Sequence, residues 1–166
     1  MAYTLSEKQN IVVLVEPEIP YNTGNIARTC VATATPLHLV KPLGFEITDK
    51  YLKRAGLDYW YDVDLTVWED FATFKGYMEA EAAAGRQIIY ATTKGGHGLG
   101  ELEVTGKTMT LFGKETAGLP EPFLFARPDR CFRIPMAAEY RSLNLSNSAA
   151  IILYEILRQQ GYPELH

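Results

Sequence analysis

The sequence predicts an α/β protein with a mostly parallel sheet flanked by helices. Short apolar runs rich in β-branched residues recur along the chain and are typical of strands buried on both faces. Stretches with apolar residues at helical spacing separate these runs, and loops dense in Gly, Pro, Asn and Ser follow several of them. A chain of 166 residues suits a single domain of this class, spanning residues 1–166.

The first unit is a strand, a loop and a helix. Ile11–Val15 is a continuous apolar run and predicts a central parallel strand. A proline-containing segment ends this strand. Asn22 and Thr23 then offer capping side chains for a helix over residues 24–34. Leu37–Val40 predicts a second strand.

The rest of the chain continues the alternation of helices and strands. Trp68–Ala84 predicts a helix that ends near Gly85, a residue that tolerates a left-handed C-terminal conformation. Lys94–Gly100 has the composition of a flexible loop. A last helix closes the chain before Gly161. Its apolar residues at helical spacing are Ala149, Ile152, Leu153, Ile156 and Leu157. Further short strands are predicted at Gln87–Ala91, Thr108–Phe112 and Cys131–Ile134.

The charge of the chain limits how it can meet nucleic acid. Its formal net charge of -4 argues against a protein that coats nucleic acid through bulk electrostatics. Local basic clusters can still contact phosphates. These clusters are Lys41, Lys50, Lys53 and Arg54, and Arg127, Arg130 and Arg133.

Composition also indicates a cytoplasmic protein with no membrane segment and no metal. No apolar run approaches the length that spans a bilayer, and the N-terminus lacks the apolar core of a signal peptide. Cys30 and Cys131 are the only cysteines, and neither belongs to a C-x-x-C pair. A structural disulfide or a zinc site is therefore not expected.

Three polar loops form the candidate site, because ligands of open α/β sheets bind at the carboxyl ends of strands. They are Asn22–Arg28, Leu111–Pro120, and Ile134–Met136 together with Arg141–Ser148. Each loop also has a purely structural explanation: a helix cap with a surface arginine, a strand-to-helix turn, and a generous helix cap. The first loop holds too few glycines for a dinucleotide fingerprint, and the second lacks the P-loop pattern.

Taken in order and at their spacing, the three loops resemble the motifs of the SPOUT superfamily of RNA methyltransferases. The matching residues are Asn22-x-Gly24-Asn25-Ile26-x-Arg28, Phe112-Gly113-x-Glu115-x-x-Gly118-Leu119-Pro120, Ile134-Pro135-Met136 and Ser142-Leu143-Asn144-Leu145-Ser146-Asn147. Flanking segments at 16–20, 54–59, 92–95 and 161–163 resemble the bacterial branch that methylates the first anticodon nucleotide of leucine tRNAs. Glu16, Tyr21 and Lys114 depart from that branch.

The resemblance implies a C-terminal deep trefoil knot, an exception to the rule that protein chains are unknotted. It also implies a homodimer formed through the knotted region. S-adenosylmethionine is the implied cofactor, and the anticodon stem-loop of a tRNA is the implied substrate. The implied cofactor pocket is lined by Ala91, Thr92, Gly113, Ile134, Met136, Ser142, Leu143 and Asn144.

The resemblance further implies roles in methyl transfer to a ribose 2′-hydroxyl. Arg28 is the implied group at the hydroxyl, oriented by Asn22 and Glu115, while Ser142 and Asn144 hold substrate or cofactor. A guanidinium keeps its proton far above neutral pH, which makes Arg28 a poor base. Two interpretations stay open: Arg28 receives the proton, or it clamps the neighbouring phosphate while another group receives the proton. The basic residues expected to hold RNA include Lys53, Arg54, Lys94 and Arg127.

Two other functions compete with this interpretation. A protein of the same fold could bind RNA or cofactor without reacting, although retention of all five implied catalytic residues argues against it. A hydrolase using Ser142, Ser146 or Ser148 has weak support, because no G-x-S-x-G turn is present. The histidines available to such an enzyme are His38, His97 and His166.

Overall fold

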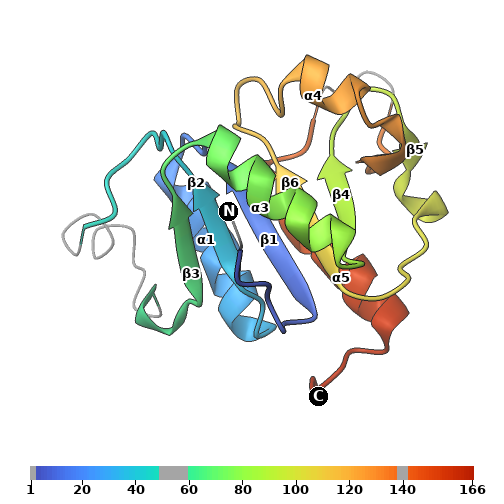
Figure 1. Ribbon diagram of the computed structural model, residues 1–166, viewed down its shortest axis with the longest axis horizontal. Coiled ribbons are helices and arrows are strands. Elements are labelled where there is room, and N and C mark those ends of the chain that lie inside the picture. Colours follow the sequence, from blue (N-terminus) through green and yellow to red (C-terminus); the bar gives the residue numbers. More distant parts are fainter. Residues whose placement is uncertain (1–2, 49–59, 138–141) are drawn as a thin grey trace.

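A seven-stranded sheet organises the computed structural model, which describes residues 3–48, 60–137 and 142–166. The strand order is β3-β2-β1-β6-β4-β7-β5, and every pair of neighbouring strands in the described residues is parallel. Figure 1 shows α3 across one face of the sheet and α1 and α5 on the other. The prediction of a mostly parallel sheet flanked by helices is confirmed.

The bounds of the elements follow the predicted alternation. The strands are β1 (Asn10–Val15), β2 (Leu37–Val40), β3 (Leu65–Trp68), β4 (Gln87–Ala91), β5 (His97–Gly98), β6 (Thr108–Phe112) and β7 (Cys131–Arg133). The helices are α1 (Pro20–Ala32), α3 (Phe71–Ala83), α4 (Glu121–Phe125) and α5 (Leu145–Gln160). Short 3-10 turns lie at η1 (Trp60–Asp62), η2 (Leu99–Glu101) and η3 (Pro128–Arg130).

The central strand β1 divides the core into two hydrophobic clusters. Val12 and Leu14 belong to the cluster under α1 and α5, whereas Ile11, Val13 and Val15 belong to the cluster under α3. All five side chains are buried, as the continuous apolar run predicts. Burial of each such side chain contributes about 1.5–3 kcal/mol, so β1 anchors both layers.

Helix α1 begins earlier than the sequence predicts. Its first residue is Pro20, whose fixed φ suits the first helical position, and its N-cap is Ile19. Asn22 and Thr23 therefore lie inside the first turn and are buried, so the prediction that they cap the helix is wrong. The helix also ends at Ala32, two residues before the predicted end, since Ala34 has a positive φ of 53°.

The predicted helix over 68–84 is wrong at its start. Residues Leu65–Trp68 form the strand β3, which pairs with β2 at one edge of the sheet. The helix α3 starts only after Asp70, whose side chain accepts a hydrogen bond from the Thr73 amide at 2.7 Å. Its end agrees with the prediction, because Gly85 follows with φ 107°.

The C-terminal half differs from the predictions in small ways. The glycine-rich loop contains the two-residue strand β5, which pairs with β7, so the prediction of a loop throughout 94–100 is wrong. Strand β7 ends one residue before Ile134. The last helix is confirmed: Asn144 caps α5, and Gly161 follows it with φ 79°.

A buried arginine anchors the N-terminal segment to the edge where the strands begin. Arg86 pairs with Glu81 at 3.2 Å, with only 1% of its side chain exposed. Its guanidinium also donates to the carbonyl oxygens of Ser6, Lys8 and Thr108 at 2.9–3.0 Å. A buried charge is tolerated only when it is paired and hydrogen-bonded, and Arg86 meets both conditions.

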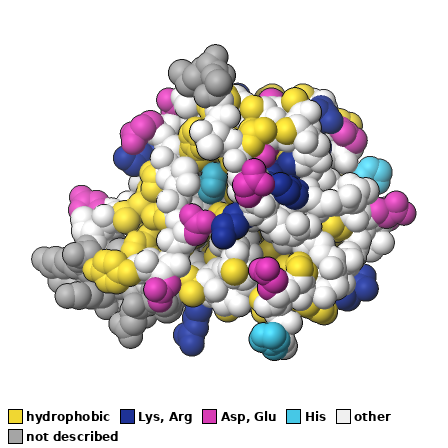
Figure 2. Space-filling view, turned by 60° about the horizontal axis from the view of Figure 1, so that its bottom comes forward, with side chains coloured by type: hydrophobic (Ala, Val, Ile, Leu, Met, Phe, Trp, Pro, Cys, Tyr) yellow, Lys and Arg dark blue, Asp and Glu magenta, His cyan; other side chains and the backbone are white. Residues whose placement is uncertain are grey.

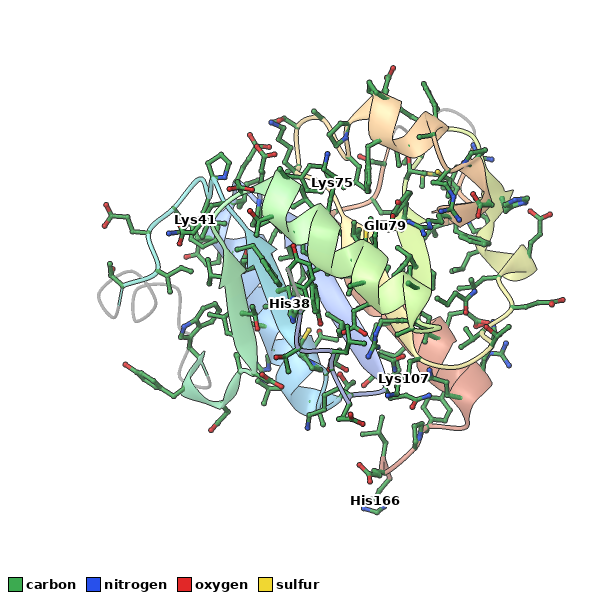
Figure 3. All side chains as sticks on the ribbon, viewed as in Figure 1. His38, Lys41, Lys75, Glu79, Lys107 and His166 are labelled. Carbon is green, nitrogen blue, oxygen red and sulfur yellow. The ribbon has the colours of Figure 1, made fainter. Side chains whose placement is uncertain are left out.

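His38 is a buried histidine of the core rather than a catalytic base. Figure 3 shows it beneath α3, and it stacks on Tyr77 with ring centroids 5.6 Å apart. The Trp68 indole N–H donates to His38 Nδ1 at 3.1 Å. Burial lowers the pKa of His38 to about 4, so the imidazole is neutral at pH 7.

The predicted basic clusters are only partly surface features. Arg130 is buried and donates to Glu79, on α3 in Figure 3, and to the Tyr90 hydroxyl, so counting it as a phosphate contact is wrong. Lys41 is half-exposed and pairs with Glu69 at 3.3 Å. Lys50, Lys53 and Arg54, the segment 54–59 and Arg141 lie outside the described residues.

The edge where the strands begin carries mixed charge. Figure 2 brings this edge forward and shows basic and acidic side chains interspersed among the described residues. A surface that binds RNA through phosphates gathers basic side chains instead. None of the described helices has the length and apolar character needed to cross a bilayer.

Candidate functional site

A cavity of about 650 Å³ lies where β4, β6 and β7 end. All three polar loops contribute to its walls, although they are far apart in the sequence. The predicted site residues that line it are Asn22, Ala91, Thr92, Gly113, Glu115, Ile134, Met136, Ser142, Leu143 and Asn144. Its volume lies within the range of about 300–1,000 Å³ that is typical of small-molecule sites.

The wall after β6 is a tightly closed turn that requires glycine. A Cβ atom on Gly113 would lie 2.0 Å from the carbonyl carbon of Gly118 and 2.1 Å from the amide nitrogen of Leu119. The Gly118 amide donates to the carbonyl of Lys114 at 2.8 Å, and Gly118 itself has φ 69°. Glycine at 113 therefore lets the two ends of the turn pack directly against each other, and the turn as a whole lines the cavity.

Glu115 fastens this turn to the start of α1. Its carboxylate accepts hydrogen bonds from the backbone amides of Glu18 at 2.7 Å and Ile19 at 3.1 Å. It also accepts one from the side-chain amide of Asn22 at 3.3 Å. A carboxylate is favourable at the positive end of a helix, so Glu115 stabilises α1 from a distant loop.

A second contact joins the same two segments, but here the carboxylate belongs to the segment before α1 and the donors belong to the turn. The carboxylate of Glu18 accepts hydrogen bonds from the Thr116 amide at 2.9 Å and the Thr116 hydroxyl at 2.7 Å. These bonds hold the pKa of Glu18 below its ordinary value. Neither residue was a candidate from the sequence, because nothing local signals a contact between positions 98 residues apart.

The segment Asn22–Arg28, predicted to be a loop, lies within α1, and Asn22 connects this helix to Asn144 at the N-terminus of α5. The Asn144 side-chain amide donates to the Asn22 side-chain oxygen at 3.1 Å. The Asn144 oxygen in turn accepts from the Ser146 amide at 2.9 Å and its hydroxyl at 2.6 Å, at the start of α5. Glu115, Asn22, Asn144 and Ser146 thus form one chain of hydrogen bonds, which we call the loop network.

Arg28 lies apart from the other candidates. It is exposed on α1 and is not among the residues that line the cavity. Six residues separate it from Asn22, which corresponds to roughly 9 Å along a helix axis. The structure therefore brings Asn22, Glu115, Ser142 and Asn144 to one cavity, and places Arg28 outside its lining, less than two turns along α1 from Asn22.

The cavity also has an apolar floor that was not predicted from the sequence, and a charged rim that includes Lys94, one of the residues expected to hold RNA. Apolar side chains from several elements form the floor: Leu119, Leu124, Phe132 and Ile152. At the rim, Lys94 pairs with Glu121 at 2.6 Å. Helical and strand periodicity mark the floor residues as buried but do not show which cavity they face.

Comparison with known proteins gives the family context of this cavity. The model of the SpoU rRNA Methylase family matches residues 9–154. A tRNA (cytidine(34)-2′-O)-methyltransferase of Yersinia pestis is 44% identical over 153 residues, covering 92% of this chain and 94% of the relative. The protein of the same name from Methylovorus glucosotrophus is 47% identical over 152 residues, covering 91% and 96%.

Solved structures agree with the sequence relatives. A structure concerned with 2-OH methylation of C/U34 on tRNA has a TM-score of 0.81 and 42% identity, covering 92% of this chain and 96% of that chain. The SpoU methyltransferase AviRb from Streptomyces viridochromogenes, in complex with the cofactor AdoMet, has a TM-score of 0.79 and 27% identity. That match covers 95% of this chain and 60% of AviRb.

Proposed function

The chain belongs to the SpoU rRNA methylase family, and on this premise we propose that it methylates the ribose 2′-hydroxyl of nucleotide 34 in a tRNA. Nucleotide 34 is the first anticodon position. The predicted fold class, a parallel sheet flanked by helices with a C-terminal knot, is the fold of this family. The observation that carries the proposal is the loop network, which holds three distant motifs around one cavity.

The cavity fits S-adenosylmethionine, the methyl donor of this family. The backbone of the turn from Gly113 to Leu119 lines the cavity, and we propose that its N–H and C=O groups contact the adenine and ribose of the cofactor. Apolar residues such as Ile134 and Met136 line the same cavity and suit the ribose and the adenine faces. When bound, the cofactor supplies a methyl group on an electrophilic sulfonium.

The residues of the chain then position and activate the ribose. We propose that Ser142 and Asn144 hold substrate or cofactor at the cavity. Asn22 and Glu115 are proposed to fix the cavity wall formed by the turn after β6 and the start of α1. Methyl transfer requires the hydroxyl oxygen in line with the methyl group, so this fixed geometry supplies much of the rate. Arg28 is proposed to clamp the neighbouring phosphate and stabilise the oxygen as it loses its proton, while a phosphate oxygen or another group receives that proton; this role suits a guanidinium better than the role of base.

A homodimer is proposed to complete the site. Large apolar side chains lie exposed on α1 and α5, which pack against each other, and on the adjoining loops. They are Ile19, Tyr21, Leu143, Ile151 and Tyr154. Because Ile19 and Leu143 also line the cavity, this apolar face is continuous with the rim of the site. Contiguous exposed apolar surface marks an interaction site, and a second copy of the chain is the proposed occupant.

The proposed dimer gives Arg28 a place in the reaction. Arg28 is exposed on α1, the helix whose exposed Tyr21 belongs to the apolar face. In a two-fold dimer each copy presents the same face to the other, so each α1 approaches the partner's rim. We propose that Arg28 serves the cavity of the partner subunit. Mixing an Arg28→Ala chain with an Asn144→Ala chain is then expected to restore activity in the mixed dimers, whereas either variant alone has little.

The substrate is proposed to be the anticodon stem-loop of leucine tRNAs, in the cytoplasm, acted on by a single domain of residues 1–166. The experiment that tests this proposal supplies labelled S-adenosylmethionine and an unmodified leucine tRNA transcript, then maps the methyl group. We expect label at the ribose of nucleotide 34. The matched control is the same tRNA carrying a 2′-deoxynucleotide at position 34, which has no acceptor hydroxyl.

The outcomes separate the competing functions. Transfer to the normal transcript and none to the deoxy transcript supports the proposal. Cofactor binding in a calorimeter without transfer to any tRNA supports a non-catalytic binding protein instead. Transfer to a different nucleotide keeps the reaction class and overturns the assigned position.

A further inference from the structure

The rim of the cavity carries an ion pair that joins two of its walls. Lys94 lies in the loop after β4 and lines the cavity, while Glu121 is the first residue of α4. Their Nζ and Oε1 atoms are 2.6 Å apart, and about half of each side chain is exposed (44% and 54%). This contact holds the lysine side chain toward α4.

The backbone around Lys94 is held by local contacts, so a change of partner for Lys94 requires only a rotation of its side chain. The Lys94 amide donates to the Thr92 hydroxyl at 3.0 Å. Two residues later Gly96 has φ 75°, and a Cβ there would lie 2.4 Å from the carbonyl oxygen of Cys131. The loop is therefore packed against β7, and Lys94 is presented at the cavity from a defined position.

Positively charged side chains outnumber negatively charged ones among the described residues that line the cavity. Among the described lining residues the charged ones are Lys94, Lys114 and Glu115. Glu115 is committed to the amides of Glu18 and Ile19, just before α1, and to Asn22. Within the described residues no carboxylate oxygen lies within 4.0 Å of the Lys114 ammonium, although Lys114 is near enough to Glu18 to help lower the pKa of that carboxyl. A ligand that brings negative charge is the complement of such a rim.

We propose that Lys94 and Lys114 bind a backbone phosphate of the RNA nucleotide whose ribose enters the cavity, and that Glu121 holds Lys94 until the RNA arrives. The proposal rests on the proposed function and names residues of the site that recognise its substrate. An exposed ion pair of this kind contributes little free energy, so a phosphate can replace the carboxylate. Glu121 then acts as a specificity residue, because it weakens the binding of any anion that cannot displace it.

Removal of Glu121 is expected to improve RNA binding, which a purely structural ion pair would not do. For Glu121→Gln we expect the KM for tRNA to fall about threefold to fivefold, with kcat and cofactor affinity unchanged. Lys94→Gln and Lys114→Gln are each expected to raise the KM for tRNA about tenfold. The double variant Lys94→Gln with Lys114→Gln, which removes the whole contact with this phosphate, should lower the slope of log affinity against log salt by about 0.7–0.9.

The matched control for charge is Glu155→Gln. Glu155 pairs with Arg158 at 2.7 Å near the far end of α5, so this variant removes the same charge away from the cavity. A double variant, Glu121→Gln with Lys94→Gln, should behave like Lys94→Gln alone, because Glu121 acts only through the lysine. Thermal unfolding of each variant checks that the fold is retained.

Several results would overturn the inference. One is a Glu121→Gln variant that changes the KM for tRNA no more than Glu155→Gln does. Another is a lysine variant that weakens cofactor binding while leaving RNA binding intact, which would assign the cofactor's carboxylate as the anion. RNA binding is measured directly by titration, so a protein that binds RNA through these lysines and transfers no methyl group contradicts the proposed function alone.

Discussion

Replacement of Gly113 by alanine is the sharpest test of how the cavity is built. The new Cβ would lie 2.0, 2.1 and 2.6 Å from backbone atoms of Gly118 and Leu119. Ordinary contacts begin near 3.4 Å, so the turn must open by about 1 Å or more, and no flexible side chain can move aside instead. Overpacking of this kind costs about 1–3 kcal/mol in the free energy of unfolding.

The assay measures thermal unfolding and S-adenosylmethionine affinity on the same samples. For a chain of this size, a loss of about 1–3 kcal/mol lowers the Tm by roughly 2–12 °C. The cavity wall moves with the turn, so we expect cofactor affinity to fall at least about tenfold, since displacements near 1 Å strongly disturb bound geometry.

The control is Gly106→Ala, where a Cβ meets no atom within 4 Å. It should leave both the Tm and the cofactor affinity close to those of the unaltered chain. A Gly113→Ala variant with unaltered affinity would refute the reasoning, because it would mean that this turn does not contact the cofactor.

Three further predictions concern the buried and networked polar groups. Burial lowers the pKa of His38 to about 4 in the folded chain, so as the pH falls the imidazole is protonated first in the unfolded chain. The free energy of unfolding is therefore highest above about pH 6.5 and falls by about 1.4 kcal/mol per pH unit toward pH 4. Urea unfolding at pH 7, 6 and 5 should show a shallower loss for His38→Gln, and equal slopes would contradict the assignment. Arg86→Met leaves Glu81 buried without its cation and should cost about 3–5 kcal/mol in urea unfolding; a loss below about 1 kcal/mol would mean that the pair is not buried in solution. Glu115→Gln keeps the shape of the side chain but replaces one of the oxygens that accept from the Glu18 and Ile19 amides by a donor. It should lower the free energy of unfolding by about 1–2 kcal/mol and weaken cofactor binding; if neither quantity changes, the loop network does not hold the site.

The elements that could be predicted are those whose burial is visible in the local pattern of apolar residues. β1 is an unbroken apolar run because both its faces are covered, and α5 shows helical spacing because one face packs on the sheet. Likewise Gly113 and Asn144 stand out as turn and cap residues, and both reach the cavity.

The features that escaped prediction depend on partners far along the chain. Pro20 marks the start of α1 locally, but the segment before it is held by Glu115, which is 97 residues from the Glu18 amide, and the sequence alone suggested Asn22 as the cap. Strand β5 consists of two residues and exists because β7 lies beside it. The pairing of Lys94 with Glu121 follows from the folding of two loops onto one rim.

The arrangement of the sheet restricts how copies of the chain can associate. Among the described residues, the edge strands of the sheet are β3, with four residues, and β5, with two. Such short edge strands offer few free backbone groups to a neighbouring chain, so extension of the sheet from molecule to molecule is disfavoured. Association is thereby directed to helical surfaces, and a loss of solubility after mutation should reflect damage to the helices rather than lateral strand addition.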